Sequence, residues 1–150
     1  MKISTRGRYA LEAVLDLAIH ADKGHVRLGD IAKRRGISEN YLEQIFIDLR
    51  KNRIITSFRG AKGGYQLARD ASNISCGDII RAAEKKTSPV MCVAEGNQKQ
   101  ECERYDLCPT RALWEKVRLT IDGIADAVNV FELTEKYKRM NSSAEIEYFI

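Results

Sequence analysis

The sequence of 150 residues contains little of what several large protein classes require. Two prolines and ten glycines are too few for a collagen-like chain or a low-complexity disordered chain. No apolar run approaches the roughly 18 residues that a membrane span needs, and the first residues form no apolar signal segment. Hydrophobic residues make up 44% of the chain, enough to bury one core. We therefore expect one soluble unit that stays in the cytoplasm.

Charge is unevenly distributed along the chain, whose net charge is +4. Residues 1–75 carry 14 Lys and Arg against 8 Asp and Glu, whereas residues 76–150 carry 11 against 13. A basic half suits a phosphate-binding surface, because neutralised phosphates release counterions. The same excess of positive charge also suits an ordinary solvated surface. Charge alone therefore does not distinguish a phosphate-binding surface from a solvated one, and the sequence motifs are needed.

The first half of the sequence predicts three helices. Apolar residues on almost every side of residues 5–21 indicate a buried helix. A short helix over 28–35 is followed by a turn at Gly36, and Ser38 is suited to cap the next helix, over about 39–52. Four apolar residues of that helix fall at helical spacing and predict its buried face: Leu42, Ile45, Phe46 and Leu49.

A short hairpin and a fourth helix follow. Two β-prone runs, at 54–58 and 65–67, flank a glycine-rich turn. Residues 75–78 resemble a capping box that opens a helix over 77–85. This order predicts a mainly α fold containing a winged helix-turn-helix, whose second helix enters the major groove of DNA.

Polar side chains on the second helix and on the wing supply the chemistry for reading DNA. Hydroxyl, amide and carboxylate groups hydrogen-bond to base edges and phosphates, and the expected residues are Ser38, Asn40, Tyr41, Glu43 and Gln44. Arg59 and Lys62 on the wing suit a phosphate track or a narrow minor groove. A solvated helix face is the alternative for each residue taken singly.

Three motifs of this chain resemble those of one known family, in the same order: KISTRGRYA at 2–10, SENYLEQ at 38–44 and RGAKGGY at 59–65. Over nearly its whole length the chain is similar to the Rrf-type winged-helix transcriptional regulators, which include the IscR, NsrR, RirA and CymR types. The resemblance implies a homodimer that binds double-stranded DNA at an imperfect palindrome. It also implies that Glu43 discriminates between bases and that Arg59 enters the minor groove.

A long dimerisation helix is expected over about 109–132, with Pro109 at its first position. Apolar residues at alternating spacings of four and three form the heptad seam of a helix pair: Val117, Ile121, Ile124, Val128 and Phe131. Packing against the chain's own first helix is the alternative. The family resemblance favours a crossed pair of these helices from two copies, which matches a two-fold operator.

Three of the four cysteines lie in one polar loop, at Cys92, Cys102 and Cys108. Clustered cysteines in a cytosolic chain indicate metal or redox chemistry rather than structural disulfides. Cys108 precedes a helix start, where the helix dipole favours a thiolate. Thiolates hold iron–sulfur clusters, and three of them leave one position to another ligand. Cys76, beside a capping serine, is interpreted as an ordinary buried residue.

The cysteine loop resembles that of the cluster-binding members of the family, and this implies an iron–sulfur cluster, 2Fe–2S ahead of 4Fe–4S. Arg111 and Arg8 stand where two such members carry a histidine and an aspartate ligand. Glu12, one helical turn beyond Arg8, is the expected fourth ligand, reaching the cluster from the partner subunit, and Asp106 is the alternative. A structural zinc site and bare redox-active thiols are the competing interpretations of the loop.

The C-terminus forms the last expected segment, in which a polar linker at 141–143 leads to a tail that ends in Tyr148, Phe149 and Ile150. The tail resembles that of CymR-type regulators, and through it the isoleucine-ended tail with which serine acetyltransferase enters cysteine synthase. A free carboxylate beside an apolar residue suits capture in a pocket, so cysteine synthase is an expected partner. A frayed or core-packed terminus is the alternative.

These observations divide the chain into a DNA-binding domain (1–85), a cysteine loop (86–108), a dimerisation region (109–140) and a tail (141–150). The leading hypothesis is a dimeric DNA-binding regulator that senses iron–sulfur cluster status, iron or redox stress. The alternative is a CymR-like regulator of cysteine and sulfur metabolism, controlled by cysteine synthase docked on the tail. We expect no enzyme or electron carrier, because no nucleophile–base pair or nucleotide-binding glycine loop is present.

Overall fold

The computed structural model describes residues 4–84, 87–94 and 102–148. The main elements in chain order are α1 (Thr5–Ile19), α2 (Leu28–Arg35), α3 (Glu39–Lys51), β1 (Ile55–Phe58), β2 (Gly64–Leu67), α4 (Cys76–Ala83), α5 (Arg111–Ala127) and α6 (Val130–Tyr148). Short 3-10 turns among these described residues connect them: η1 (Ala21–Lys23), η2 (Ala71–Asn73), η3 (Met91–Val93) and η5 (Tyr105–Leu107). The expected mainly α fold class is confirmed.

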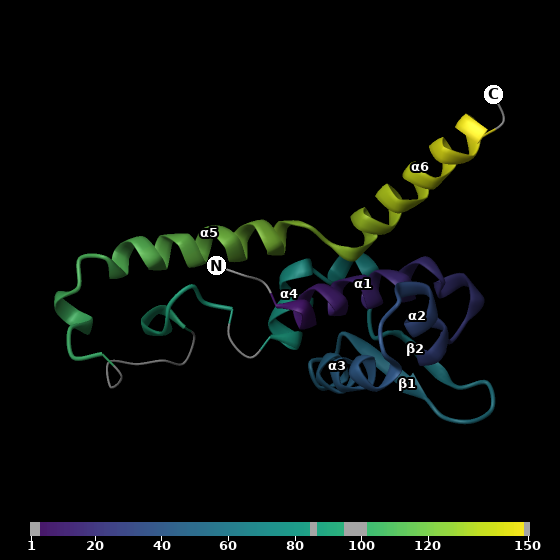
Figure 1. Ribbon diagram of the computed structural model, residues 1–150, viewed down its shortest axis with the longest axis horizontal. Helices are drawn as coiled ribbons and strands as arrows, with labels where there is room; N and C mark the ends of the chain where they lie inside the picture. Colours follow the sequence, from purple (N-terminus) through teal and green to yellow (C-terminus); the bar gives the residue numbers. More distant parts are fainter. Residues whose placement is uncertain (1–3, 85–86, 95–101, 149–150) are drawn as a thin grey trace.

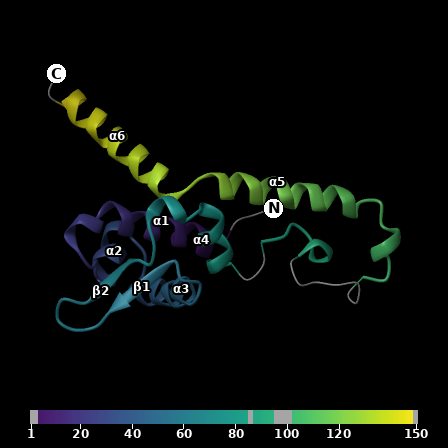
Figure 2. The same ribbon diagram turned by 180° about the vertical axis from the view of Figure 1, so that it is seen from behind.

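One body contains the first four helices and the hairpin, and α5 and α6 extend from it in different directions (Figures 1 and 2). Helix α1 packs against α2, α3, α4 and α6, so it lies at the centre of this body. The apolar core includes Ala10, Ala13, Val14, Leu17, Ile31, Leu42, Ile45, Phe46, Leu49, Ile54, Ile55, Ile74 and Ile79. Helix α3 is the second helix of the predicted helix-turn-helix, and the burial of its predicted apolar face is therefore confirmed.

The turn between α2 and α3 has the local chemistry that the sequence predicts. Gly36 adopts a left-handed conformation, with φ of 63°, which suits a residue without a Cβ. Ile37 is buried, and the Ser38 hydroxyl accepts a hydrogen bond from the backbone N–H of Tyr41 at 3.2 Å. This cap starts α3 at a fixed angle to α2.

The wing is an antiparallel pair of β1 and β2, with Ile55 opposite Leu67. An isolated bridge between Val26 and Tyr65 adds a third backbone segment beside it. The imidazole ring of His25 stacks on the Phe58 ring, with centroids 3.8 Å apart. These contacts attach the wing to the loop before α2, a connection that the sequence pattern did not reveal.

The expected continuous helix over 109–132 is wrong, because the structure ends α5 at Ala127 and begins α6 at Val130. Backbone pairing with the segment before α4 causes the break. The N–H of Cys76 donates to the carbonyl of Val128 at 2.8 Å, and the N–H of Val130 donates to the carbonyl of Ile74 at 2.9 Å. The expected heptad seam is therefore interrupted.

Two further expectations about helix ends are corrected. Pro109 lies before α5, which begins at Arg111, because the N–H of Arg111 bonds to the carbonyl of Cys108 and the chain is still a turn there. The expected polar linker at 141–143 is helical and belongs to α6. Its polar residues continue the helix, and Ser142 donates its hydroxyl to the carbonyl of Lys138 at 2.9 Å.

A buried carboxylate joins α1 to α2. The side chain of Asp16 is 1% exposed. One oxygen accepts from Nη2 of Arg34 at 2.6 Å, and the other accepts from Nε of Arg35 at 3.0 Å. This hydrogen bond from Arg34 to Asp16 is the main reason that the pKa of the Arg34 guanidinium is raised. The two arginines are the last residues of α2, so Asp16 fixes the helix that precedes the turn.

Replacing Asp16 with alanine should lower the free energy of unfolding by about 2–4 kcal/mol, because two guanidinium groups lose their buried partner. Urea unfolding of the purified protein measures this change. Asp22→Ala is the matched control, since Asp22 is exposed, and it should change stability by no more than about 0.5 kcal/mol. Equal effects of the two substitutions would contradict the assigned role of Asp16.

Candidate nucleic-acid interface and cysteine segment

The polar face of α3 is open to solvent. Asn40, Glu43 and Gln44 are exposed, while the opposite face of α3 is buried in the core. Their side chains therefore remain available to base edges in a major groove. The structure brings these three predicted residues together on one surface.

Ser38 and Tyr41 are partly engaged within the protein. The Ser38 oxygen caps α3, although its O–H can still donate to a phosphate. The ring of Tyr41 is half-buried and forms a T-shaped pair with the Tyr9 ring, with centroids 6.0 Å apart. Tyr41 therefore also helps to hold the start of α3 against α1.

Arg6 binds α3 from helix α1. The sequence pattern did not indicate this residue. Its Nε donates to the carbonyl of Ala83 at 2.9 Å, and its Nη2 donates to the carbonyl of Gln44 at 3.0 Å. The same Nη2 forms an ion pair with Asp48. Its partners lie 38 or more positions along the chain, so no local spacing indicated the contact. Arg6 thus joins α1, α3 and the end of α4.

Arg59 and Lys62 are exposed in the turn between β1 and β2. The segment before α2 supports this turn, because Nη2 of Arg27 donates to the carbonyl of Ala61 at 2.9 Å. Two cationic side chains on a braced turn suit contacts to phosphates. The wing and the exposed face of α3 carry the residues of the expected interface, and their contacts to DNA stay a prediction.

The cysteines lie on different parts of the loop. Cys92 is within η3, which packs against α5, while Cys102 and Cys108 lie on either side of η5. All three thiols are free and half-buried. Among the residues that the structure describes, no group of three His, Cys, Asp or Glu is placed to hold a metal ion. The three cysteines are therefore not gathered into one ligand set.

Cys108 and Cys76 have opposite chemical environments. The hydroxyl of Thr110 lies 3.2 Å from the Cys108 sulfur, and this hydrogen bond, with the backbone N–H groups at the approach to α5, lowers the pKa of the Cys108 thiol. Burial raises the pKa of the Cys76 thiol, and Cys76 is 7% exposed. This agrees with the interpretation of Cys76 as an ordinary buried residue and leaves Cys108 as the more reactive thiol.

The two expected fourth ligands lie on separate elements. Glu12 is on α1, where its carboxylate is 3.8 Å from Nε of Arg8. Asp106 is within η5, two residues before Cys108. Of the tail residues, Tyr148 ends α6, and Phe149 and Ile150 lie outside the described residues.

The turn between α2 and α3, the exposed polar face of α3 and the braced cationic wing define a winged helix-turn-helix DNA-binding protein. The sequence model of the Rrf2 family, described as an iron-dependent transcriptional regulator, matches residues 3–136. The chain belongs to this family. It is a transcriptional regulator and not an enzyme.

Individual relatives agree with this assignment. The transcriptional regulator IscR of Klebsiella pneumoniae (strain 342) is 38% identical over 143 residues, which make up 95% of this chain and 85% of that protein. The structure of T. potens IscR matches with a TM-score of 0.72 at 38% identity, covering 91% of this chain and 88% of that one. The structure of CymR, the global cysteine regulator of B. subtilis, matches with a TM-score of 0.71 at 34% identity, covering 91% and 98%.

The lowered pKa of Cys108 should appear as early alkylation by iodoacetamide. In the metal-free protein, Cys108 should react at a lower pH than an ordinary thiol, whereas Cys76 should react only at higher pH, because the thiolate is the nucleophile. Thr110→Val removes the main hydrogen bond and should move the midpoint for Cys108 upward. Mass spectrometry of the alkylated peptides measures both.

Thr120→Val is the control for this substitution, because Thr120 is on α5 and its hydroxyl bonds to the carbonyl of Lys116. It should leave the pH midpoint of Cys108 unchanged. A midpoint that is the same with and without the Thr110 hydroxyl would rule out this cause of the lowered pKa.

Proposed function

We propose that the protein is a cytoplasmic, homodimeric regulator whose occupancy of an imperfect palindromic operator depends on an iron–sulfur cluster held by Cys92, Cys102 and Cys108. The observation that carries the proposal is the environment of Cys108. A thiol of lowered pKa stands three residues before α5, in the same loop as two other free thiols. A thiolate is the form that binds iron.

The chemical types of the available ligand atoms fit such a cluster. Three half-buried thiols without disulfides supply three soft ligands, and a carboxylate, from Glu12 of the partner subunit or from Asp106, supplies a fourth of oxygen type. We propose a 2Fe–2S cluster. Binding would require the three thiols to approach one another, since they are apart in the described part of the chain.

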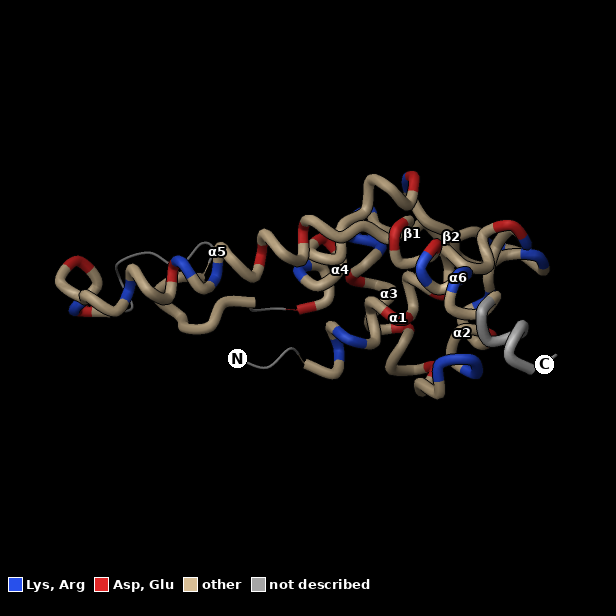
Figure 3. Tube along the Cα trace, turned by 90° about the horizontal axis from the view of Figure 1, so that it is seen from above, with Lys and Arg blue, Asp and Glu red and all other residues tan. Residues whose placement is uncertain are grey.

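The homodimer is supported by the surface of α5. This helix of 17 residues has no buried residue in the single chain. Its large exposed apolar side chains are Leu113, Trp114, Leu119 and Ile124. Acidic and basic residues are interspersed along it (Figure 3), so a second copy offers complementary charges as well as an apolar face. We propose that α5 pairs with α5 of the partner, spacing the two α3 helices for one turn of DNA.

A second candidate function is regulation of cysteine and sulfur metabolism through a protein partner. The observation that favours it is that the structure of CymR, named a global cysteine regulator, matches about as well as that of IscR. Tyr148, Phe149 and Ile150 would then bind cysteine synthase. Anaerobic purification separates the two candidates, because operator binding by a protein that never contains iron or sulfide favours the second.

Glu43 should discriminate between bases. Glu43→Ala should relax specificity by roughly 1–3 kcal/mol at one base pair of each half-site, because an exposed carboxylate of α3 accepts from cytosine and repels other edges. Binding to a set of operators with single substitutions measures this. An equal loss of affinity for every sequence would contradict base reading by Glu43.

Arg59→Ala and Lys62→Ala should, unlike Glu43→Ala, affect binding without regard to base sequence. Each should weaken binding across all sequences and reduce the slope of log affinity against log salt concentration by about 1, because a phosphate contact releases counterions. An unchanged slope would exclude the substituted residue from the phosphate contacts.

Substituting any one of Cys92, Cys102 and Cys108 with alanine should abolish the visible absorbance and the bound iron and sulfide of anaerobically purified protein. Each variant should then bind the operator as the cluster-free wild type does. Cys76→Ala is the matched control and should keep the absorbance, since Cys76 is in the core. Retention of iron by the triple variant would refute the cluster site.

A further inference from the structure

Arg69, which follows β2, holds the backbone at the point where the recognition helix α3 ends. Its Nη1 donates to the carbonyl of Arg53 at 2.7 Å, and its Nε donates to the carbonyl of Asn73 at 2.9 Å. Arg53 has a φ of 56°, a left-handed conformation that is uncommon for a residue with a side chain. Such a conformation needs support from its surroundings, and Arg69 supplies part of it.

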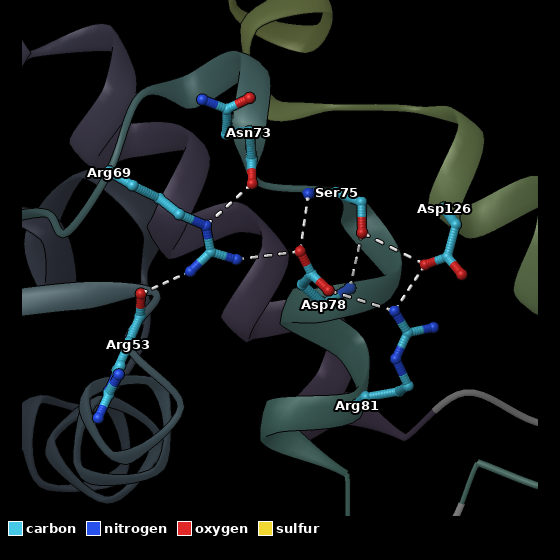
Figure 4. A network of polar contacts seen from close by, with 7 residues as sticks. All are labelled: Arg53, Arg69, Asn73, Ser75, Asp78, Arg81 and Asp126. Atoms are coloured by element: carbon cyan, nitrogen blue, oxygen red, sulfur yellow. Dashed lines mark hydrogen bonds and ion pairs between the residues drawn. The ribbon is translucent and has the colours of Figure 1, made fainter.

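The same guanidinium reaches the start of α4 (Figure 4). Its Nη2 donates to the carboxylate of Asp78 at 3.1 Å. Asp78 also accepts from the backbone N–H of Ser75 at 3.2 Å, as part of the capping box of α4. Its other oxygen accepts from Nη2 of Arg81 at 3.3 Å. Through Arg69, Asp78 therefore joins the cap of α4 to Arg53, just beyond the end of α3.

Asp126, near the end of α5, completes the network (Figure 4). Its Oδ1 accepts from Nη2 of Arg81 at 2.6 Å and from the Ser75 hydroxyl at 3.3 Å. The carboxylate lies directly over Gly77, where a Cβ would be 1.9 Å from the same oxygen. The contact between α5 and α4 thus depends on a glycine in the first turn of α4.

These contacts form an unbroken polar connection from α5, through α4, to the backbone of Arg53, two residues beyond the end of α3. We propose that Asp126 and Arg69 are positioning residues, through which a displacement of α5 changes the placement of the recognition helix. The side chains of the network are between 33% and 46% exposed, and exposed ion pairs add little stability. Their role is therefore positioning more than folding.

The cysteine loop is placed to move α5. The η3 turn that contains Cys92 packs against α5, and Cys108 lies three residues before Arg111, the first residue of α5. Gathering the three thiols around a cluster requires η3, the residues around Cys108, or both to move, and each of these segments adjoins α5. The movement of α5 by cluster binding rests on the proposed function, whereas the polar connection from Asp126 to Arg53 is independent of it.

Two variants break the network by unrelated means. Asp126→Asn removes the charge that Arg81 pairs with, while keeping the shape of the side chain. Gly77→Ala removes no charge but places a methyl group where the Asp126 oxygen lies, and alanine is the better helix former of the two. Glu135→Gln is the control, because it breaks an exposed pair with Lys138 on α6.

The first measurement is the ratio of operator affinities of the cluster-loaded and cluster-free full-length protein. Asp126→Asn and Gly77→Ala should each bring this ratio at least roughly 5-fold closer to one than in the wild type, with no loss of thermal stability in Gly77→Ala. Glu135→Gln should keep the wild-type ratio. Affinities that fall equally in both forms, with the ratio unchanged, would mark a merely structural contact and overturn the proposal.

The second measurement is amide hydrogen exchange in the cluster-free protein. The N–H groups of Arg53 and Ile54, which bond to the carbonyls of Arg50 and Leu49, should exchange at least roughly 5-fold faster in both variants than in the wild type or Glu135→Gln. Unchanged exchange would overturn the positioning role. If wild-type affinity is the same with and without the cluster, the proposed function fails, and exchange alone decides whether the network positions α3.

Discussion

The antiparallel pairing of residues 128–130 with residues 74–76 is the constraint on which the arrangement beyond the DNA-binding body depends. Two backbone hydrogen bonds across it end α5 and start α6. They also hold the C-terminal end of α5 beside the first turn of α4, where Asp126 lies over Gly77. The rest of α5 is left without buried residues. A helix that is held at its C-terminal end by α4, contacted by η3, and left with large apolar side chains exposed is suited to a partner copy and to transmitting movement.

Local signals in the sequence predicted most of the DNA-binding body. Gly36, Ser38 and the pair Ser75 and Asp78 act within a few residues of themselves, so the turn and both caps have the expected form. The break at Val128 was not predictable in the same way, because its cause lies about 50 positions earlier in the chain. The apolar spacing alone predicted a continuous helix through this position. Spacing carries no information about pairing with a backbone segment that is distant in the sequence.

The same limit applies to the candidate site. Residue type and helical phase placed Glu43 and Gln44 on an exposed face, because burial of the other face leaves these positions no alternative. Arg6 had no such signal, since its three partners come from distant elements. The cysteine spacing indicated a ligand set in kind, but it carried no information on where the loop would place each thiol, and the described residues do not gather them.

Two arginines from other elements hold the recognition helix α3 and the segment that directly follows it. Arg6 binds the middle of α3 to the end of α4 that leads into the cysteine loop. Arg69 binds Arg53, just beyond α3, to the start of α4. Helix α4 is therefore the common support of α3, and α5 contacts it. A regulator must change its DNA affinity without unfolding, and partly exposed ion pairs between intact helices allow this because each can shift at small energetic cost. Control of α3 through α4 follows from the way in which the helices are joined.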